Sequence, residues 1–352
     1  MAFNPTVDGL FLLKLGLPLV AVFLSFWWNR SAAAKGTRRR ASPSSASPSP
    51  SCSSSVSRPA GASRSQRSSL PLPRSYVMTV KGRRSCMEDA HLEIMNLLSV
   101  YPSVPPPSAD TALSLFAVFD GHGGAGAAEY AKAQLPLILT RATPQELLAD
   151  PEKLLNATIQ ELESKFLAVA SERKIEDGTS LVVAVIANQQ LVVSNLGSCH
   201  AVVCRAGQAA VLSTDHTLDN WDERARVTES GGVIYKNRLG HPHLNHVLFN
   251  VEVTRALGDR MYKDLEITTG KESGLLAVPD SQVWSLGDLD EFVILFTGSL
   301  CRRVNFQNLC ATVKSQLESQ TPPSIILHNL LGQIIRKSHD NVTAMLILLK
   351  PF

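Results

Sequence analysis

The sequence has 352 residues, of which 44% are hydrophobic and 18% are charged, and this is ample apolar material for the core of one large globular domain. Charge is divided unevenly, because residues 1–87 hold 13 basic residues and one acid, a net charge of +12, whereas the remaining 21 basic and 30 acidic residues give −9. No zinc-ligand spacing and no alternation of basic and aromatic residues accompanies the basic region, so we expect no nucleic-acid partner.

Residues 10–28 form an apolar run that contains one charged residue, Lys14, and ends in three aromatic residues. A bilayer core needs about 20 apolar residues, and tryptophans favour its interface with water. Basic residues follow directly and, by the positive-inside rule, keep the downstream domain in the cytosol; they are Arg30, Lys35, Arg38, Arg39 and Arg40. We therefore predict a single-pass membrane anchor within residues 1–30. The alternative is a transit peptide for a mitochondrion or plastid, because the same region is rich in Arg and Ser and poor in acids.

Residues 31–74 consist mainly of Ser, Pro, Ala and Arg and contain almost no large apolar side chain. Such a composition cannot bury enough surface to offset the entropy lost on ordering. We predict that this segment is a disordered basic linker between the anchor and one globular domain at 75–352.

The globular region begins with an apolar strand pattern at 76–80, followed shortly by Arg84 and by the acidic pair Glu88 and Asp89. Carboxylate oxygens suit Mg²⁺ or Mn²⁺, and a guanidinium is shaped for bidentate recognition of phosphate. These three side chains are therefore candidates for a site that binds metal and phosphate.

A second apolar strand pattern, at 115–119, runs into Asp120, Gly121 and His122 and then into two more glycines. A carboxylate at the end of a buried strand is costly unless its charge is compensated, and a divalent cation is a common partner. The glycines allow a backbone carbonyl to come close to an ion. An Asp-Gly turn that merely ends a strand is the plain alternative for this motif taken alone, but the first acidic pair favours a metal site.

Further along the chain, helical and strand patterns alternate. Helices are predicted at 123–134, 151–171, 219–230, 304–318 and 323–336, and strands at 191–194, 201–205, 209–212, 292–296 and 342–349. Periodicity alone predicts an α+β domain.

Four motifs occur in order along 76–349: GRRSCMEDAH at 82–91, FDGHGG at 119–124, RALGD at 255–259 and DNVT at 340–343. Their order and spacing resemble the metal-dependent serine/threonine protein phosphatases of type 2C. The apolar segment ahead of the domain is most similar to that of the membrane-anchored "protein phosphatase 1-like" branch. The resemblance implies a four-layer αββα sandwich of two antiparallel sheets flanked by helices. It also implies a monomeric catalytic domain that acts on phosphorylated proteins.

The resemblance further implies a binuclear site for Mg²⁺ or Mn²⁺. In it, Asp120 bridges two metal ions, the carbonyl of Gly121 binds one of them and Asp340 binds the other. Glu88 and Asp89 hold waters that are bound to the metals.

Two further residues receive catalytic roles from the same resemblance. Arg84 holds the substrate phosphate, and His122 serves as the general acid for the leaving alcohol. The implied reaction is in-line attack of water, activated by the metals, on phosphoserine or phosphothreonine.

The late part of the sequence departs from the family's pattern. Gly298 stands where a metal-binding aspartate is expected, Arg302 replaces a second acidic residue, and Ser198 replaces an aspartate that serves a weaker third metal. Phe249 aligns with a usual glycine. Losing one direct carboxylate should weaken the metal pair by at least ~10-fold, as losses around metal sites typically do.

Two other sets of residues could bind metal or form disulfides. His241, His243 and His246 have a spacing compatible with a transition metal, but no fourth ligand accompanies them, so a surface loop or substrate flap is the better interpretation. The six cysteines contain no C-x-x-C pair and indicate a reducing compartment; they are Cys52, Cys86, Cys199, Cys204, Cys301 and Cys310.

Two functions therefore remain open at the level of sequence. The first is a membrane-tethered phosphatase with a weakened metal pair, which the retained motif residues favour. The second is a pseudophosphatase that binds phosphoproteins or acts as a scaffold, which Gly298, Arg302 and Ser198 favour.

Overall fold

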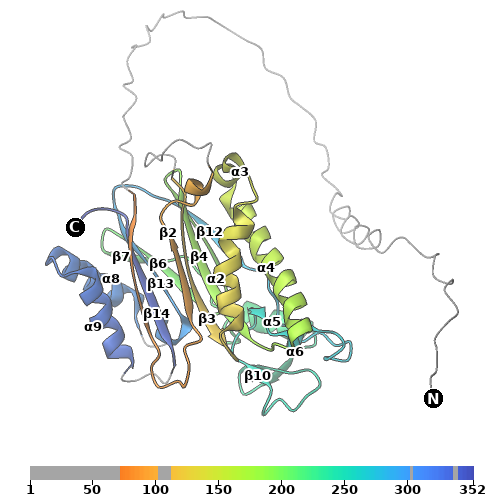
Figure 1. The fold of residues 1–352 in the computed structure, drawn as a ribbon. Helices are drawn as coiled ribbons and strands as arrows, with labels where there is room; N and C mark the ends of the chain where they lie inside the picture. Colours follow the sequence, from red (N-terminus) through yellow and green to blue (C-terminus); the bar gives the residue numbers. More distant parts are fainter. Residues whose placement is uncertain (1–71, 102–111, 302–303, 336–339) are drawn as a thin grey trace, which may run out of the picture. The chain divides into compact units, whose positions relative to one another are not determined.

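The computed structural model describes residues 72–101, 112–301, 304–335 and 340–352 (Figure 1). The predicted anchor, the linker as far as residue 71, and Arg302 lie outside these ranges. Within them, no helix is both long enough and apolar enough to cross a bilayer.

The first of two large sheets has the strand order β1-β14-β13-β6-β7, and every neighbouring pair is antiparallel. Its strands are β1 (Arg74–Val80), β6 (His200–Arg205), β7 (Gln208–Val211), β13 (Asp290–Phe296) and β14 (Val342–Leu348). β13 and β14 are buried along their whole length, as their almost continuous apolar sequences require.

The second large sheet has the order β12-β5-β4-β3-β2 and is also antiparallel, with β11 paired to one end of β4. Its strands are β2 (Ala90–Ile94), β3 (Ser114–His122), β4 (Gly178–Ala187), β5 (Gln190–Leu196), β11 (Leu257–Gly258) and β12 (Asp280–Ser285). A short 3-10 helix, η1 (Leu97–Val100), follows β2.

The two sheets pack face to face, and helices cover both outer faces (Figure 1). Apolar side chains from both sheets, such as Phe116, Val182, Val293 and Met345, fill the central layer. The helices α2 (Gly126–Leu139), α3 (Pro144–Ala149) and α4 (Pro151–Arg173) cover the second sheet, and α8 (Phe306–Glu318) and α9 (Pro323–Ile335) cover the first. This arrangement confirms the predicted αββα sandwich.

Strand register brings three distant segments together at one end of the sandwich. Asp120 lies opposite Ser180 at the end of β3. Phe296, which ends β13, lies opposite Ala344 near the start of β14, and the Thr297 N–H donates to the carbonyl of Thr343. The residues that follow β13 and precede β14 therefore adjoin the end of β3.

A smaller unit beside this end contains α5 (Trp221–Glu229), the three-stranded sheet β8 (Val233–Tyr235), β9 (Arg238–Gly240) and β10 (Asn250–Val251), and the short helix α6 (Arg260–Lys263). We call residues 233–251 the flap. The sequence did not predict its strands, because runs of two or three residues are too short for a period-two pattern to appear.

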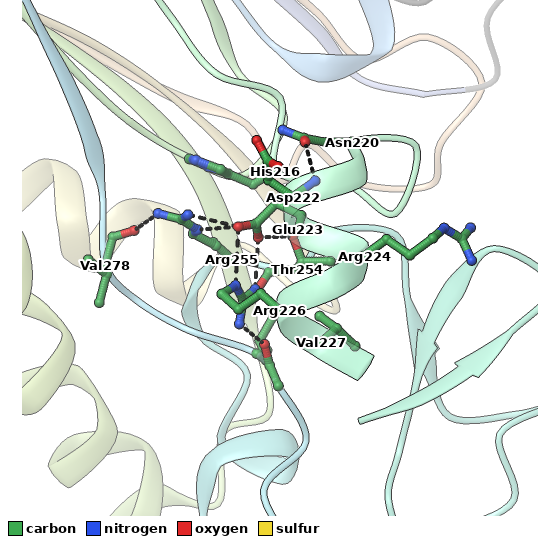
Figure 2. A network of polar contacts seen from close by, with 12 residues as sticks. His216, Asn220, Asp222, Glu223, Arg224, Arg226, Val227, Thr254, Arg255 and Val278 are labelled. Carbon is green, nitrogen blue, oxygen red and sulfur yellow. Dashed lines mark hydrogen bonds and ion pairs between the residues drawn. The ribbon is translucent and has the colours of Figure 1, made fainter. Parts of the chain in front are cut away.

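A buried polar network fixes α5 to the body of the domain (Figure 2). The carboxylate of Glu223 accepts hydrogen bonds from Arg226, Arg255 and the hydroxyl of Thr254. Burial raises the pKa of Glu223, but the two guanidinium groups outweigh it and bring the pKa to about 2. His216 lies in the same region and contacts Asp280.

Candidate metal and phosphate site

Asp120 is the central carboxylate of the site. Its Oδ2 accepts a hydrogen bond of 2.8 Å from the backbone N–H of Gly298. Burial raises the pKa of Asp120 to about 6, although the Gly298 N–H opposes this shift, and the neighbouring charge of Asp340 adds to it. A carboxylate in this position therefore lacks full charge compensation from the protein.

Asp89 lies deeper, at the start of β2. Thr343 and Thr297 donate hydrogen bonds of 2.7 and 3.3 Å to its Oδ2, whereas among the described residues nothing pairs with its buried Oδ1. Burial and the charge of Asp120 raise the pKa of Asp89 to about 8. Two neighbouring carboxylates that both favour protonation indicate a region with too little positive charge.

Arg84 joins the first and last motifs. Its Nε lies 2.9 Å from Oδ1 of Asp340, and its Nη1 lies 3.9 Å from Oε2 of Glu88. The turn before it requires glycine at residue 82, where φ is +64° and an added Cβ would come within 2.3 Å of the Asp340 carbonyl oxygen. Arg84, Glu88 and Asp340 thus lie together.

Asn341 connects the same two motifs through the backbone. Its side chain accepts from the N–H of Glu88 at 2.8 Å and donates to the carbonyls of Lys81 and Cys86. Gly121 also lies against this segment, since a Cβ on it would meet the Glu88 carbonyl oxygen at 2.3 Å. Close backbone packing explains the small residue, which sequence analysis had assigned only to metal binding.

His122 is held by a residue that sequence analysis did not assign a role. Its Nε2 lies 2.9 Å from both carboxylate oxygens of Asp259, the last residue of the RALGD motif. Burial lowers the pKa of His122, but Asp259 outweighs this effect and the net shift is upward. Asp259 therefore favours the charged form of the imidazole, which is the form that a general acid requires.

Arg84, Asp120, His122 and Asp340 line one cleft with a volume of about 800 Å³. Its lining combines the motif residues with the flap and includes Arg83, Arg84, Asp120, His122, Arg238, Asn250, Val251, Asp259, Tyr262, Gly298 and Asp340. A phosphorylated side chain that enters the cleft would meet both basic groups, such as Arg84, and acidic groups, such as Asp120.

The donor set fits one hard divalent cation better than two. The orphaned Oδ1 of Asp89 and the raised pKa values of Asp89 and Asp120 favour a cation here, and Mg²⁺ commonly takes one or two carboxylates and several waters. However, in the described ranges no three His, Cys, Asp or Glu side chains form a ready metal-binding group. Asp120 and the Gly121 carbonyl would hold one ion, and Asp340, whose Oδ1 pairs with Arg84, would contribute to a second.

Gly298 and Ser198, which the sequence predicts to stand at acidic positions of the family pattern, pack against each other. An added Cβ on Gly298 would lie 2.5 Å from the Ser198 hydroxyl and 3.1 Å from the Ser198 Cβ. Ser198 is buried, and its N–H lies 3.4 Å from the hydroxyl of Ser180. The two departures from the family pattern are thus neighbours in space.

The histidine cluster is not a metal site. His241 is buried, its Nδ1 accepts from the N–H groups of His243 and Leu244, and its Nε2 donates to the carbonyl of Met261. Both ring nitrogens of His241 are hydrogen-bonded, so this side chain stabilises the flap. Cys86, Cys204 and Cys310 are free thiols.

The sequence profile described as "Protein phosphatase 2C" matches residues 74–342, more than half of the chain. The chain belongs to the protein phosphatase 2C family. Sequence relatives include "Probable protein phosphatase 2C 22" of Arabidopsis thaliana, which is 30% identical over 80% of this chain and 70% of the relative. "Integrin-linked kinase-associated serine/threonine phosphatase 2C" of Rattus norvegicus is 29% identical over 78% of this chain and 72% of the relative.

Solved structures support the fold of this protein phosphatase 2C domain. The serine-threonine phosphatase 2C of Toxoplasma gondii superposes with a TM-score of 0.63 at 19% identity and covers 81% of this chain and 97% of that one. A sex determining protein of C. elegans has the same TM-score at 22% identity, over 79% of this chain and 65% of that one. At these identities the likeness shows the fold alone.

Proposed function

We propose that this chain is a metal-dependent protein serine/threonine phosphatase with one strong and one weakened metal position. The observation that carries the proposal is the convergence of Arg84, Asp120, His122 and Asp340 on one cleft. The family relationship supports the reaction class, and Gly298 supports the weakening.

Each residue has a distinct task in this proposal. A hard divalent cation held by Asp120 and the Gly121 carbonyl supplies Lewis-acid stabilisation and lowers the pKa of water. Arg84 exchanges part of its pairing with Asp340 for the phosphate oxygens, for which a guanidinium is a bidentate partner.

His122 supplies the proton to the leaving alcohol. Because its Nε2 is held by Asp259, Nδ1 is the nitrogen that delivers this proton in the present ring orientation. Asp259 favours the charged form of the ring and fixes its orientation, which is the usual task of a carboxylate behind a catalytic histidine.

Release of phosphate from a phosphothreonine peptide, measured on the full chain across a Mn²⁺ titration, tests the proposal. We expect turnover that rises with Mn²⁺ up to high concentration, because the second position is weak. Asp120→Asn should abolish it, whereas Asp288→Asn, at an exposed position between β12 and β13, should not. Absence of Mn²⁺-dependent release by the wild type contradicts the proposal.

One observation favours a second candidate, a pseudophosphatase that binds phosphoproteins without hydrolysing them. The Gly298 N–H donates to one oxygen of Asp120, and Arg84 pairs with Oδ1 of Asp340, so contacts within the protein already engage both acidic side chains in part. Phosphopeptide binding that persists without metal and without turnover would favour this candidate.

We also propose that residues 10–28 tether the protein to a membrane with the phosphatase domain in the cytosol. The apolar length and the basic residues after it support this proposal. The substrates would then be phosphoproteins at or near that membrane.

A further inference from the structure

The loop between β9 and β10 is a compact turn held by its own polar groups. The Asn245 carbonyl accepts from the N–H groups of Leu248 and Phe249, and the Asn245 side chain accepts from the N–H of Val247. The Asn250 side chain donates to the carbonyl of His246. Such bonds fix the path of residues 245–250 without help from a partner.

This turn exposes three consecutive apolar residues. Val247, Leu248 and Phe249 are 58%, 75% and 36% exposed, and we call them the apolar rim. Isolated exposed apolar side chains are common, but a contiguous group on an ordered turn is typical of a contact surface. Because the turn is already ordered, little conformational entropy is lost when a partner covers it.

The apolar rim is continuous with the wall of the cleft. Asn250 and Val251, which follow it directly, line the cleft. The ring of Phe249 lies edge-on to His241 at 6.5 Å between centroids, and His241 packs on Tyr262 at 5.4 Å. Tyr262 is itself part of the cleft lining.

The base of the flap is anchored as well. The Asn237 side chain, in the turn between β8 and β9, donates to Asp219 at 2.6 Å and accepts from Arg224 on α5. The Glu223 network then ties α5 to the body of the domain (Figure 2). The rim is therefore held at a defined position beside the cleft.

We propose that the apolar rim is a substrate-docking surface that selects phosphoproteins with a large apolar side chain close to the phosphoserine or phosphothreonine. The inference rests on the proposed function for the placement of the phosphate. Arg83, Arg84 and Arg238 line the adjoining cleft, so a phosphate held there brings the flanking residues of a substrate to the rim. Covering Leu248 would stabilise such a complex, because it removes apolar surface from water.

Binding and turnover of fluorescent phosphothreonine peptides by the full chain test the inference separately. In one peptide series, leucine replaces serine at each flanking position in turn. We expect one or two positions at which leucine tightens binding at least ~5-fold, the factor that corresponds to about 1 kcal/mol. Leu248→Ser and Val247→Ser should remove this preference and leave binding of the all-serine peptide unchanged.

Leu289→Ser is the matched control, because Leu289 is 63% exposed but precedes β13, whose seven residues place it about 20 Å from Gly298. It should keep the preference.

Equal binding of all leucine peptides by the wild type, or a preference that survives Leu248→Ser, overturns the inference. A change of oligomeric state in Leu248→Ser, seen by sedimentation without loss of the preference, would assign the rim to a second copy of the chain instead. If the wild type shows the binding preference but does not hydrolyse the peptides, the proposed function is contradicted and the docking surface is still supported.

Discussion

Gly298→Asp introduces a carboxylate at the position predicted to have lost a metal ligand, and the structure gives its steric cost. The added Cβ would lie 2.5 Å from the Ser198 hydroxyl, so Ser198 must move, at a cost of about 1–3 kcal/mol in the free energy of unfolding. Ser198→Gly removes that hydroxyl and leaves the Ser198 carbonyl oxygen, at 3.1 Å, as the nearest remaining contact. The double variant should therefore regain most of the lost stability.

Metal affinity should follow the same order. We expect the double variant to bind Mn²⁺ at least ~10-fold more tightly than the wild type, with the single variant between them. Titration calorimetry measures the affinities, and urea denaturation measures the stabilities. Gly332→Asp on α9, where an added Cβ has no described atom within 4 Å, controls for the introduced charge. If the Gly298 variants bind Mn²⁺ no more tightly than the Gly332 variant, the assignment of Gly298 to the missing ligand is wrong.

Three further predictions concern the support of the site and the leader. Glu223→Gln should lower the free energy of unfolding by about 3 kcal/mol at pH 7, because the pKa of Glu223 falls from 4.5 to about 2 on folding. The same substitution at the exposed Glu229 should not lower it. In the wild type, the stability that Glu223 contributes is present above pH 4.5 and is lost as the pH falls toward 2. Asp259→Asn should reduce kcat by at least ~10-fold for phosphopeptides but less for p-nitrophenyl phosphate, whose leaving group needs little protonation, and an equal loss for both would argue against a proton-transfer role for His122. Deleting residues 1–30 should move the protein from the membrane to the soluble fraction, whereas wild-type protein recovered from mitochondria with a shortened N-terminus would support the transit peptide.

The sequence predicted those parts of the molecule that depend on local pattern or on an uncommon motif. The αββα layers followed from the resemblance, and Arg84, Asp120 and Asp340 do meet in one cleft. The predicted helix at 151–171 is observed as Pro151–Arg173. The strand predicted at 76–80 is observed as Arg74–Val80.

Other features arise only from tertiary contacts. The pairing of Asp259 with His122 joins residues 137 positions apart and places Asp259 in a left-handed conformation, with φ of 54°, that no periodicity reveals. The RALGD motif was the available signal, but it gave no role for its last residue. Likewise, the bond from Gly298 to Asp120 is made by a backbone N–H, which every residue except proline possesses.

The most direct test of a metal-dependent site is Mn²⁺ calorimetry on the wild type and on Asp120→Ala. We expect a saturable heat of Mn²⁺ binding for the wild type and its loss in the variant, because Asp120 is the central carboxylate of the site. Asp89 beside it also lacks a partner for Oδ1 among the described residues. Thermal unfolding of both proteins confirms that the variant remains folded. Equal Mn²⁺ heats in the two proteins would contradict the metal site and the enzymatic function that depends on it.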